Sequence, residues 1–198
     1  MNKKSLLLTV IIVAVTFVFT MMPANSSQRA TMHDIKQYII QCSTEMGVEP
    51  EIALSIAKHE TGFCQEKRSY MGAVGVFQVL PSTARRFGYN PYQYKSNIKC
   101  GIAYYKQMKR MFKTDAMALA AYNAGPGTVK RYGGIPPYAE TKRYVRTVMK
   151  YYNEYKSNPD ATVAPMLAAI KAPKEDQKVL AEKEHREMLT LFMLNQAI

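Results

Sequence analysis

Glu60 is the residue of this sequence best placed for acid chemistry, because it stands at the end of an apolar segment. Apolar residues precede it at helical spacing, at Ile52, Ala53, Ile56 and Ala57. Glu60 therefore lies near one edge of the buried face of a predicted helix. Burial raises the pKa of a carboxyl group toward neutral pH, where the group can protonate a glycosidic oxygen. The alternative is a structural role, in which the carboxylate binds a neighbouring backbone amide at the helix end.

The other residue types indicate neither a metal site nor a nucleotide site. The three histidines are scattered at positions 33, 59 and 185, and no cluster of Cys, His, Asp and Glu has metal-ligand spacing. The sequence has no glycine-rich phosphate loop, and no serine lies on a recognisable nucleophile turn. Glu66 falls in a charged loop, which favours solvation over chemistry. We therefore expect chemistry from carboxylates and amides, with no metal and no cofactor.

The elements that must position Glu60 are predicted to be helices, so the fold class is mainly α. Apolar residues at helical spacing, with Pro or Gly at the segment ends, predict helices within residues 33–46, 48–62, 80–88, 97–112, 114–125 and 139–156. In the second of these, Pro50 occupies the first turn and Gly62 is the stop signal. The segment that follows Gly125 is expected to be a loop with at most one helical turn. Residues 157–176 are interpreted as a linker, before a last helix at about 175–196.

The first 26 residues have the layout of a secretory signal peptide. Lys3 and Lys4 are followed by an uncharged run and then by small residues. Left uncleaved, the run is about long enough to anchor the chain in a membrane. In either case the rest of the chain is expected to be exported, to the periplasm or the cell envelope.

Export permits disulfides, and the sequence has three cysteines. Cys64 and Cys100 both fall near predicted element ends, so they are the expected pair. Cys42 lies on the apolar face of the first helix and is interpreted as a small core residue.

The formal net charge of +12 favours polyanionic partners. For an exported chain we expect anionic cell-wall polymers or lipid head groups in this role, and no nucleic acid. A membrane partner is expected only through an uncleaved signal segment.

Five strings in a fixed order carry a resemblance to a known family. They are "HETGF", "GAVGVFQVLPSTA", "NIKCGIAYY", "ALAAYNAGPGTVKRY" and "IPPYAETKRYV". Together they resemble the lytic transglycosylase domain, which is related in fold to goose-type lysozyme, over about residues 35–155. The resemblance implies a lysozyme-like helical bundle with a sugar-binding cleft at residues 32–156. Residues 157–198 are then a linker and a C-terminal helical extension.

The resemblance also implies site residues. Glu60 matches the catalytic acid of the family's Glu-Ser-Gly string, with Thr61 in place of the serine. The family's Gly-Leu-Met-Gln string is matched by residues 75–78, where Phe77 replaces Met and is expected to keep an apolar wall against a sugar ring. Further matches to the family's cleft, expected to bind substrate, are Gln78, Tyr122, Asn123 and Tyr144. The amides of Gln78 and Asn123 suit the N-acetyl and hydroxyl groups of a sugar. The two tyrosines are expected to bond Glu60 or a substrate oxygen, or to be core rings with polar tips.

The sequence shows no second catalytic carboxylate, whereas glycosidases normally use two. Asp115 is at a predicted helix start, and Glu140 is interpreted as a structural residue in another motif. By the resemblance, Glu60 acts alone on peptidoglycan, between N-acetylmuramic acid and N-acetylglucosamine. It protonates the bridging oxygen and then deprotonates the 6-hydroxyl of the muramoyl sugar as a 1,6-anhydro ring closes.

Two other functions stay open at this stage. One is a lysozyme-type hydrolase with the same site. The other is a wall-binding subunit of a secretion, conjugation or pilus apparatus, in which activity is incidental or absent. Under the transglycosylase hypothesis, deletion of residues 159–198 is expected to leave cleavage intact.

Overall fold

The computed structural model of the chain describes residues 30–172, together with 182–183, 185–190 and 192–194. The predicted signal peptide lies outside the described residues. The end of the predicted linker, from residue 173, and part of the last predicted helix also lie outside them. The chain divides into two compact units, and the larger one, Ala30–Ala168, holds every candidate site residue.

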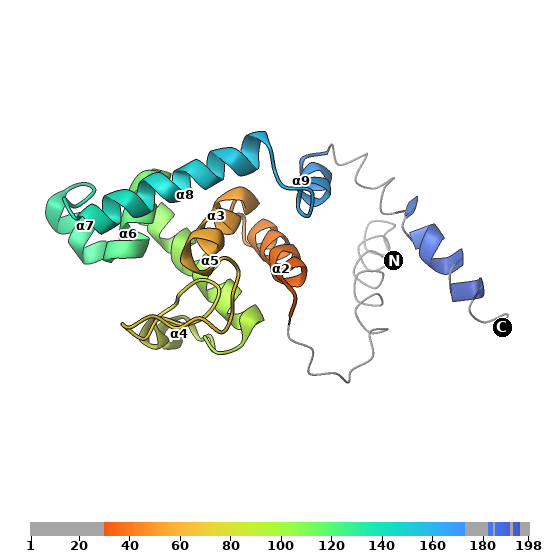
Figure 1. The fold of residues 1–198 in the computed structure, drawn as a ribbon, viewed down its shortest axis with the longest axis horizontal. Helices are drawn as coiled ribbons and strands as arrows, with labels where there is room; N and C mark the ends of the chain where they lie inside the picture. The colour runs from red at the N-terminus through yellow and green to blue at the C-terminus, as the bar shows by residue number, and fades with distance from the viewer. Residues whose placement is uncertain (1–29, 173–181, 184, 191, 195–198) are drawn as a thin grey trace, which may run out of the picture. The chain divides into compact units, whose positions relative to one another are not determined.

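The described part of the chain is helical, which confirms the predicted fold class. Its helices are α2 (Met32–Glu45), α3 (Pro50–Thr61), α4 (Pro81–Phe87), α5 (Tyr94–Phe112), α6 (Asp115–Ala124), α7 (Pro126–Tyr132), α8 (Ala139–Ser157) and α9 (Ala164–Lys171) (Figure 1). Among the described residues, extended pairing is limited to two isolated bridges, Arg68 with Val74 and Val74 with Val79.

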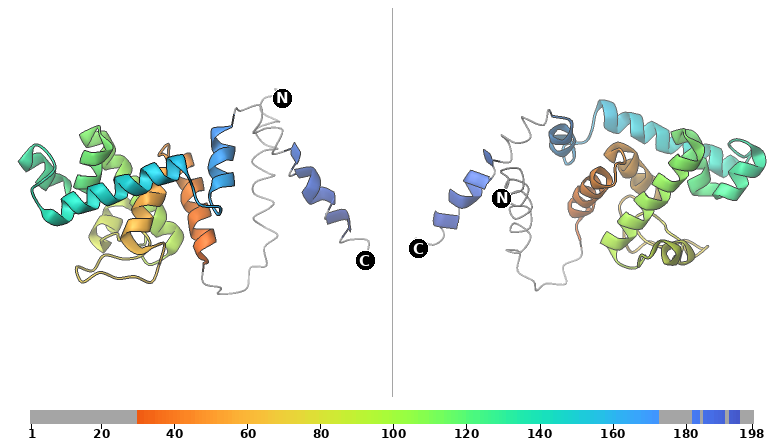
Figure 2. Two further views of the ribbon diagram at one scale, coloured as in Figure 1. Left: turned by 45° about the horizontal axis from the view of Figure 1, so that its top comes forward. Right: turned by 180° about the vertical axis from the view of Figure 1, so that it is seen from behind.

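Helix α3 lies at the centre of the packing. It contacts α8 along much of its length and α2 on another side, while α6 packs against α5, α7 and α8 (Figures 1 and 2). The core between these helices is made of fully buried aliphatic side chains, among them Ile39, Leu54, Ile56, Ile98, Ile102, Leu119 and Val148. The C-terminal end of α3 is therefore held by neighbours on two sides, and Glu60 lies there.

The ends of α3 follow the signals in the sequence. Pro50 occupies its first position, where the missing N–H costs no hydrogen bond. Gly62 ends it in the left-handed conformation, with φ of 63°, and its N–H bonds back to the carbonyls of Ala57 and Lys58. Because the helix stops two residues after Glu60, the carboxyl group is at the helix end.

Two segments expected to be irregular contain helices. Residues 126–132 form α7, which starts with Pro126 at its first position. Residues 164–171 form α9, within the segment interpreted as a linker. In that segment Val163 and Leu167 are 0% and 2% exposed, so they belong to the core of the compact unit. The unit therefore extends to Ala168, beyond the boundary expected at residue 156.

An ion pair between a buried lysine and an exposed aspartate ties this extension to α2. Lys36 is only 8% exposed, and its ammonium group donates to Asp160 Oδ2 and to Thr162 Oγ1, both at 3.0 Å. The same group lies 5.2 Å from the centre of the Phe63 ring. Without Asp160 a buried charge would lose its partner, which is strongly destabilising.

We therefore expect a chain that ends at Asn158 to lose about 3 kcal/mol or more of unfolding free energy, from the unpaired Lys36 and the lost burial of Val163 and Leu167. A chain that ends at Ala172 keeps all of these contacts and is the matched control. Thermal unfolding of both should show a melting temperature lower by about 10 °C for the shorter chain. Equal melting temperatures would contradict this account.

The expected Cys64–Cys100 disulfide is wrong. All three cysteines are thiols, and Cys42 is buried as predicted, at 1% exposure. Cys100 lies inside α5 with 0% exposure, because that helix begins at Tyr94, earlier than expected. Cys64 lies in the loop after α3, where its Sγ donates to Glu66 Oε2 at 3.4 Å.

Candidate active site

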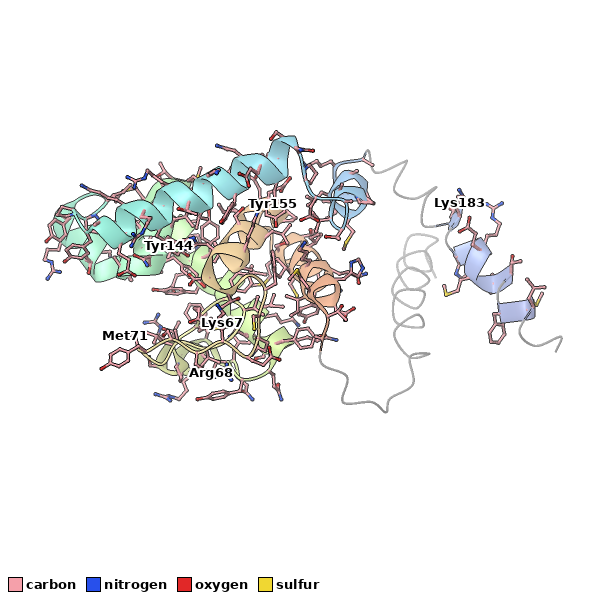
Figure 3. All side chains as sticks on the ribbon, in the orientation of Figure 1. Lys67, Arg68, Met71, Tyr144, Tyr155 and Lys183 are labelled. Atoms are coloured by element: carbon pink, nitrogen blue, oxygen red, sulfur yellow. The ribbon has the colours of Figure 1, made fainter. Side chains whose placement is uncertain are left out.

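Helices α3 and α8 bring Glu60 and Tyr144 together. Figure 3 labels Tyr144 on α8. The hydroxyl of Tyr144 donates a 2.8 Å hydrogen bond to Glu60 Oε1, and Tyr144 is 3% exposed. The His59 ring contacts the Tyr144 ring edge-on, with centroids 4.7 Å apart. The carboxyl group of Glu60 is thus held by a side chain that is itself fixed in the core, as the resemblance allowed.

The pKa of Glu60 is raised from 4.5 to about 7. Burial is the main cause, because it penalises the charged carboxylate, and the charge of Glu140 acts in the same direction. The hydrogen bond from Tyr144 opposes both by stabilising the carboxylate. A carboxyl group that is half protonated near neutral pH is suited to give a proton and then take one back.

We expect the carboxyl ¹³C signal of Glu60 to titrate with a midpoint near pH 7 in a sample labelled on glutamate. In Tyr144→Phe the midpoint should move upward, because the variant loses the bond that stabilises the charged form. The signal can be assigned by its absence in Glu60→Gln. A midpoint near the usual glutamate value, or a downward shift in Tyr144→Phe, would contradict this electrostatic account.

Gln78 lies in a strained turn of the loop that joins α3 to α4. Its φ is +46°, a conformation that residues other than glycine rarely adopt. Its Nε2 donates to the carbonyl of Gly75 at 2.9 Å and to that of Lys67 at 3.3 Å. No described residue donates to its Oε1. The side chain is half-buried, so it can present an acceptor to a ligand.

Two residues that sequence reasoning missed hold this loop in place. Asn97 is fully buried in α5, where its Oδ1 accepts from the Phe77 N–H at 2.9 Å and its Nδ2 donates to the carbonyls of Val74 and Pro91. Gln65 Oε1 accepts from the Val76 N–H at 3.3 Å. An asparagine at a core position of an amphipathic helix was the available signal, because a buried amide needs partners.

Tyr122 and Asn123 lie near the end of α6. The Tyr122 hydroxyl donates to the carbonyl of Phe77 at 2.8 Å. Its hydrogen bond is therefore made to the loop and not to Glu60. Asn123 Oδ1 accepts from the Thr141 hydroxyl at 2.8 Å, which fixes the amide against α8. Both side chains are half-buried. Thr141 was not among the expected site residues, although it lies in the string that carries Tyr144.

Phe77 and Thr61 do not have the expected roles in substrate binding. Phe77 is 0% exposed, so its ring cannot form a wall against a sugar. The ring fills the space above Gly101 of α5, where a Cβ atom would come within 2.3 Å of it. Thr61 is 8% exposed, and its hydroxyl donates to the carbonyl of Val76 at 3.1 Å and accepts from the Cys64 N–H at 3.0 Å. Both residues therefore hold the loop that carries Gln78 against the core.

The described residues contain no group of three His, Cys, Asp or Glu side chains that could hold a metal ion. Within the same part of the chain, no helix is both long and apolar enough to cross a membrane.

The model of the family described as the transglycosylase SLT domain matches residues 37–145. The chain belongs to this family. The match runs from α2 into α8 and includes Glu60, Gln78, Asn123 and Tyr144. The resemblance seen in the five sequence strings is thereby confirmed.

Curated relatives and solved structures support membership of the same family. The soluble lytic murein transglycosylase of Escherichia coli K12 is 30% identical over 129 residues, which are 52% of this chain and 20% of that enzyme. The transglycosylase of Enterobacteria phage PRD1 is 28% identical over 62% of this chain and 44% of its own length.

Among solved structures, the 70 kDa soluble lytic transglycosylase of Escherichia coli is 26% identical with a TM-score of 0.55. It matches over 64% of this chain and 25% of its own. An inactive mutant of the lytic transglycosylase Slt of Pseudomonas aeruginosa, in which a glutamate is changed to glutamine, matches with 27% identity and the same TM-score and coverage. This SLT domain thus spans about a fifth to a quarter of the length of these large enzymes.

Proposed function

We propose that the chain is a lytic transglycosylase that cleaves the β-1,4 bond between N-acetylmuramic acid and N-acetylglucosamine in peptidoglycan. The observation that carries this proposal is the pair Glu60 and Tyr144, in which a half-buried carboxyl group has a pKa of about 7 and a fixed hydrogen-bond partner. Membership of the SLT domain family supports the same chemistry. The inactive Slt mutant of Pseudomonas aeruginosa has a glutamine in place of a glutamate, which is the change that would remove the acid group of Glu60 here.

The proposed reaction has two proton transfers through one residue. Protonated Glu60 gives its proton to the bridging oxygen, and the bond from the muramoyl C1 to that oxygen breaks. The N-acetyl carbonyl of the muramoyl sugar supports the positive centre. Glu60, now a carboxylate, takes the proton of the 6-hydroxyl group of the muramoyl sugar. The oxygen of that hydroxyl group then forms the new bond to C1. Atoms and charge balance without water, because the product is a 1,6-anhydro sugar and a free N-acetylglucosamine hydroxyl.

One carboxyl group is sufficient for this route, and the surroundings of Glu60 favour it. Asp115 is bonded to Tyr105 and Lys109 at the start of α6, so it is committed to structure. Glu140 acts on Glu60 through its charge and lies exposed in the first turn of α8. In our proposal Glu140 helps to keep Glu60 protonated, whereas in a hydrolase it would have to activate water.

In the same proposal Gln78 Oε1 and the Asn123 amide hold hydroxyl or N-acetyl groups of the glycan. The chain is further proposed to act after export, in the periplasm or cell envelope, since its substrate is there. An association with envelope machinery is compatible with this role, because such a machine requires local opening of the wall.

Mass spectrometry of soluble fragments tests the proposal. Purified peptidoglycan is digested with the chain from residue 27 onward, and the ends of the released glycans are identified. Anhydro-muropeptides are the expected product. Reducing ends would show a lysozyme-type hydrolase, with Glu140 as the first candidate base. No fragments from a folded, wall-bound protein would favour the wall-binding subunit.

A further inference from the structure

The sequence from residue 67 to residue 114 contains no Asp or Glu, although it makes up a large part of the domain. It contains ten basic residues, Lys67, Arg68, Arg85, Arg86, Lys95, Lys99, Lys106, Lys109, Arg110 and Lys113. The excess positive charge is therefore not spread evenly along the chain. It is concentrated in the loop that carries Gln78 and in the two helices that follow.

Three of these residues lie exposed on the loop and helix that flank Gln78. Lys67 is at the start of the loop, and Arg85 and Arg86 are in the last turn of α4. We call these three the cationic lip. No carboxylate among the described residues lies within ion-pair distance of any of them. By contrast, Lys36, Lys58, Lys109 and Lys156 each pair with a carboxylate.

Hydrogen bonds of the loop fix the backbone of Lys67 relative to Gln78. The carbonyl of Lys67 accepts from the Gly75 N–H at 3.0 Å and from Gln78 Nε2 at 3.3 Å. Arg68 has a different task, because its guanidinium donates to the carbonyls of Gln65 and Lys67 and so braces the base of the loop (Figure 3). Helix α4 begins at Pro81, two residues after Val79, which pairs with Val74 of the same loop.

An anion bound by the lip would therefore arrive together with whatever Gln78 binds. Arginine and lysine side chains in this arrangement suit carboxylates, and Arg can bind them in a bidentate manner. The glycan of peptidoglycan carries carboxylates on its peptide stems, one stem on each muramoyl sugar. Lipid head groups would meet cations on any exposed face, whereas Lys67 is bonded through its carbonyl to Gln78 and the two arginines are on the helix that follows the same loop.

We propose that the cationic lip binds peptide-stem carboxylates of the strand being cleaved, and that it does so beside Gln78. This inference rests on the proposed function, since it names the part of the same substrate that the lip recognises. It predicts that the chain prefers walls whose stems carry free carboxylates over walls in which those groups are amides.

The test uses the full chain, two variants and two forms of one substrate. Purified wall is compared with the same wall after its stem carboxylates have been converted to neutral amides with a carbodiimide and ammonia. The lip variant is Lys67→Gln, Arg85→Gln and Arg86→Gln together. The matched control, Lys142→Gln, Arg146→Gln and Lys150→Gln, removes the same charge from one exposed face of α8, the helix whose Tyr144 is buried.

Wild type is expected to lose about ten-fold in kcat/KM when the wall is amidated, as is reasonable for a few exposed ion pairs. The lip variant should lose the same factor on native wall and respond little to amidation. The α8 control should behave like wild type. An unchanged response of the lip variant to amidation would overturn the proposal, as would equal losses in both variants, which would indicate attraction by net charge alone. The chemical identity of the products, which tests the proposed function, is read separately in each digest.

Discussion

Glu60→Gln is expected to lower the rate of wall cleavage by about a thousand-fold, because general acid–base catalysis contributes roughly 10²–10⁴ and Glu60 is proposed to supply both proton transfers. Glutamine keeps the size of the side chain and an oxygen that can accept from Tyr144, but it has no proton to give at neutral pH. Anhydro-muropeptide release measured by mass spectrometry gives the rate. A variant that keeps a tenth of the wild-type rate would exclude Glu60 as the acid.

The same substitution should also change how the melting temperature depends on pH, because it removes the titratable group of Glu60. The pKa of Glu60 is raised in the folded state from 4.5 to about 7, so between these pH values the native protein holds a proton that the unfolded chain has lost. Stability of the wild type must then fall as pH rises through this window. Glu60→Gln has no such group, so its melting temperature should gain on that of wild type between pH 4.5 and pH 8. A gap that stays constant across this range would contradict the raised pKa, whatever the effect on activity.

Gly101→Ala is expected to destabilise the domain by about 3 kcal/mol, at the upper end of typical overpacking costs. A Cβ atom at Gly101 would lie 2.3–2.4 Å from Cβ, Cγ and Cδ1 of Phe77. Phe77 cannot move away easily, because Asn97 accepts from its N–H and Tyr122 donates to its carbonyl. The melting temperature should fall by about 10 °C. Cleavage should fall as well, since Gln78 follows Phe77 in the strained turn.

Gly127→Ala is the control for this experiment. Gly127 also lies in a helix, but a Cβ atom there meets nothing within 4 Å, so the change should be neutral or slightly stabilising. In the Gly101→Ala background, Phe77→Ala should cost less stability than it costs in the wild type, because there it also removes the clash. Two results would show that Phe77 is not the obstacle. One is a Gly101→Ala protein as stable as wild type, and the other is a double variant that loses more stability than the sum of the two single losses.

The sequence was most informative where one local signal decides the structure. Pro50 and Gly62 define the ends of α3 because their backbone preferences are strong. Glu60 was found because a carboxyl group at the edge of an apolar stripe has few explanations. The family strings then brought Tyr144 and Asn123 to the same region, although they are far from Glu60 along the chain.

Sequence reasoning failed where the direction of a side chain depends on a partner from another element. Phe77 matches a position of a family string, but Gly101 decides that its ring enters the core. Cys100 was misplaced because the start of α5 at Tyr94 carries no side-chain cap that could mark it. Residues 157–176 contain Pro and polar residues, and these concealed the fact that Val163 and Leu167 complete the core.

The candidate site is divided between two kinds of segment, since Glu60 lies near the end of a packed helix while Gln78 and Lys67 belong to a loop held by its own carbonyls and by Asn97. Under the proposed function, acid strength and substrate binding then depend on separate segments of the chain. We therefore expect that loop 67–78 can be exchanged between relatives if Asn97, Gly101 and Tyr122, which contact Phe77, are kept with it. Under that proposal, an exchanged loop is expected to change which walls are cleaved while the acid stays the same.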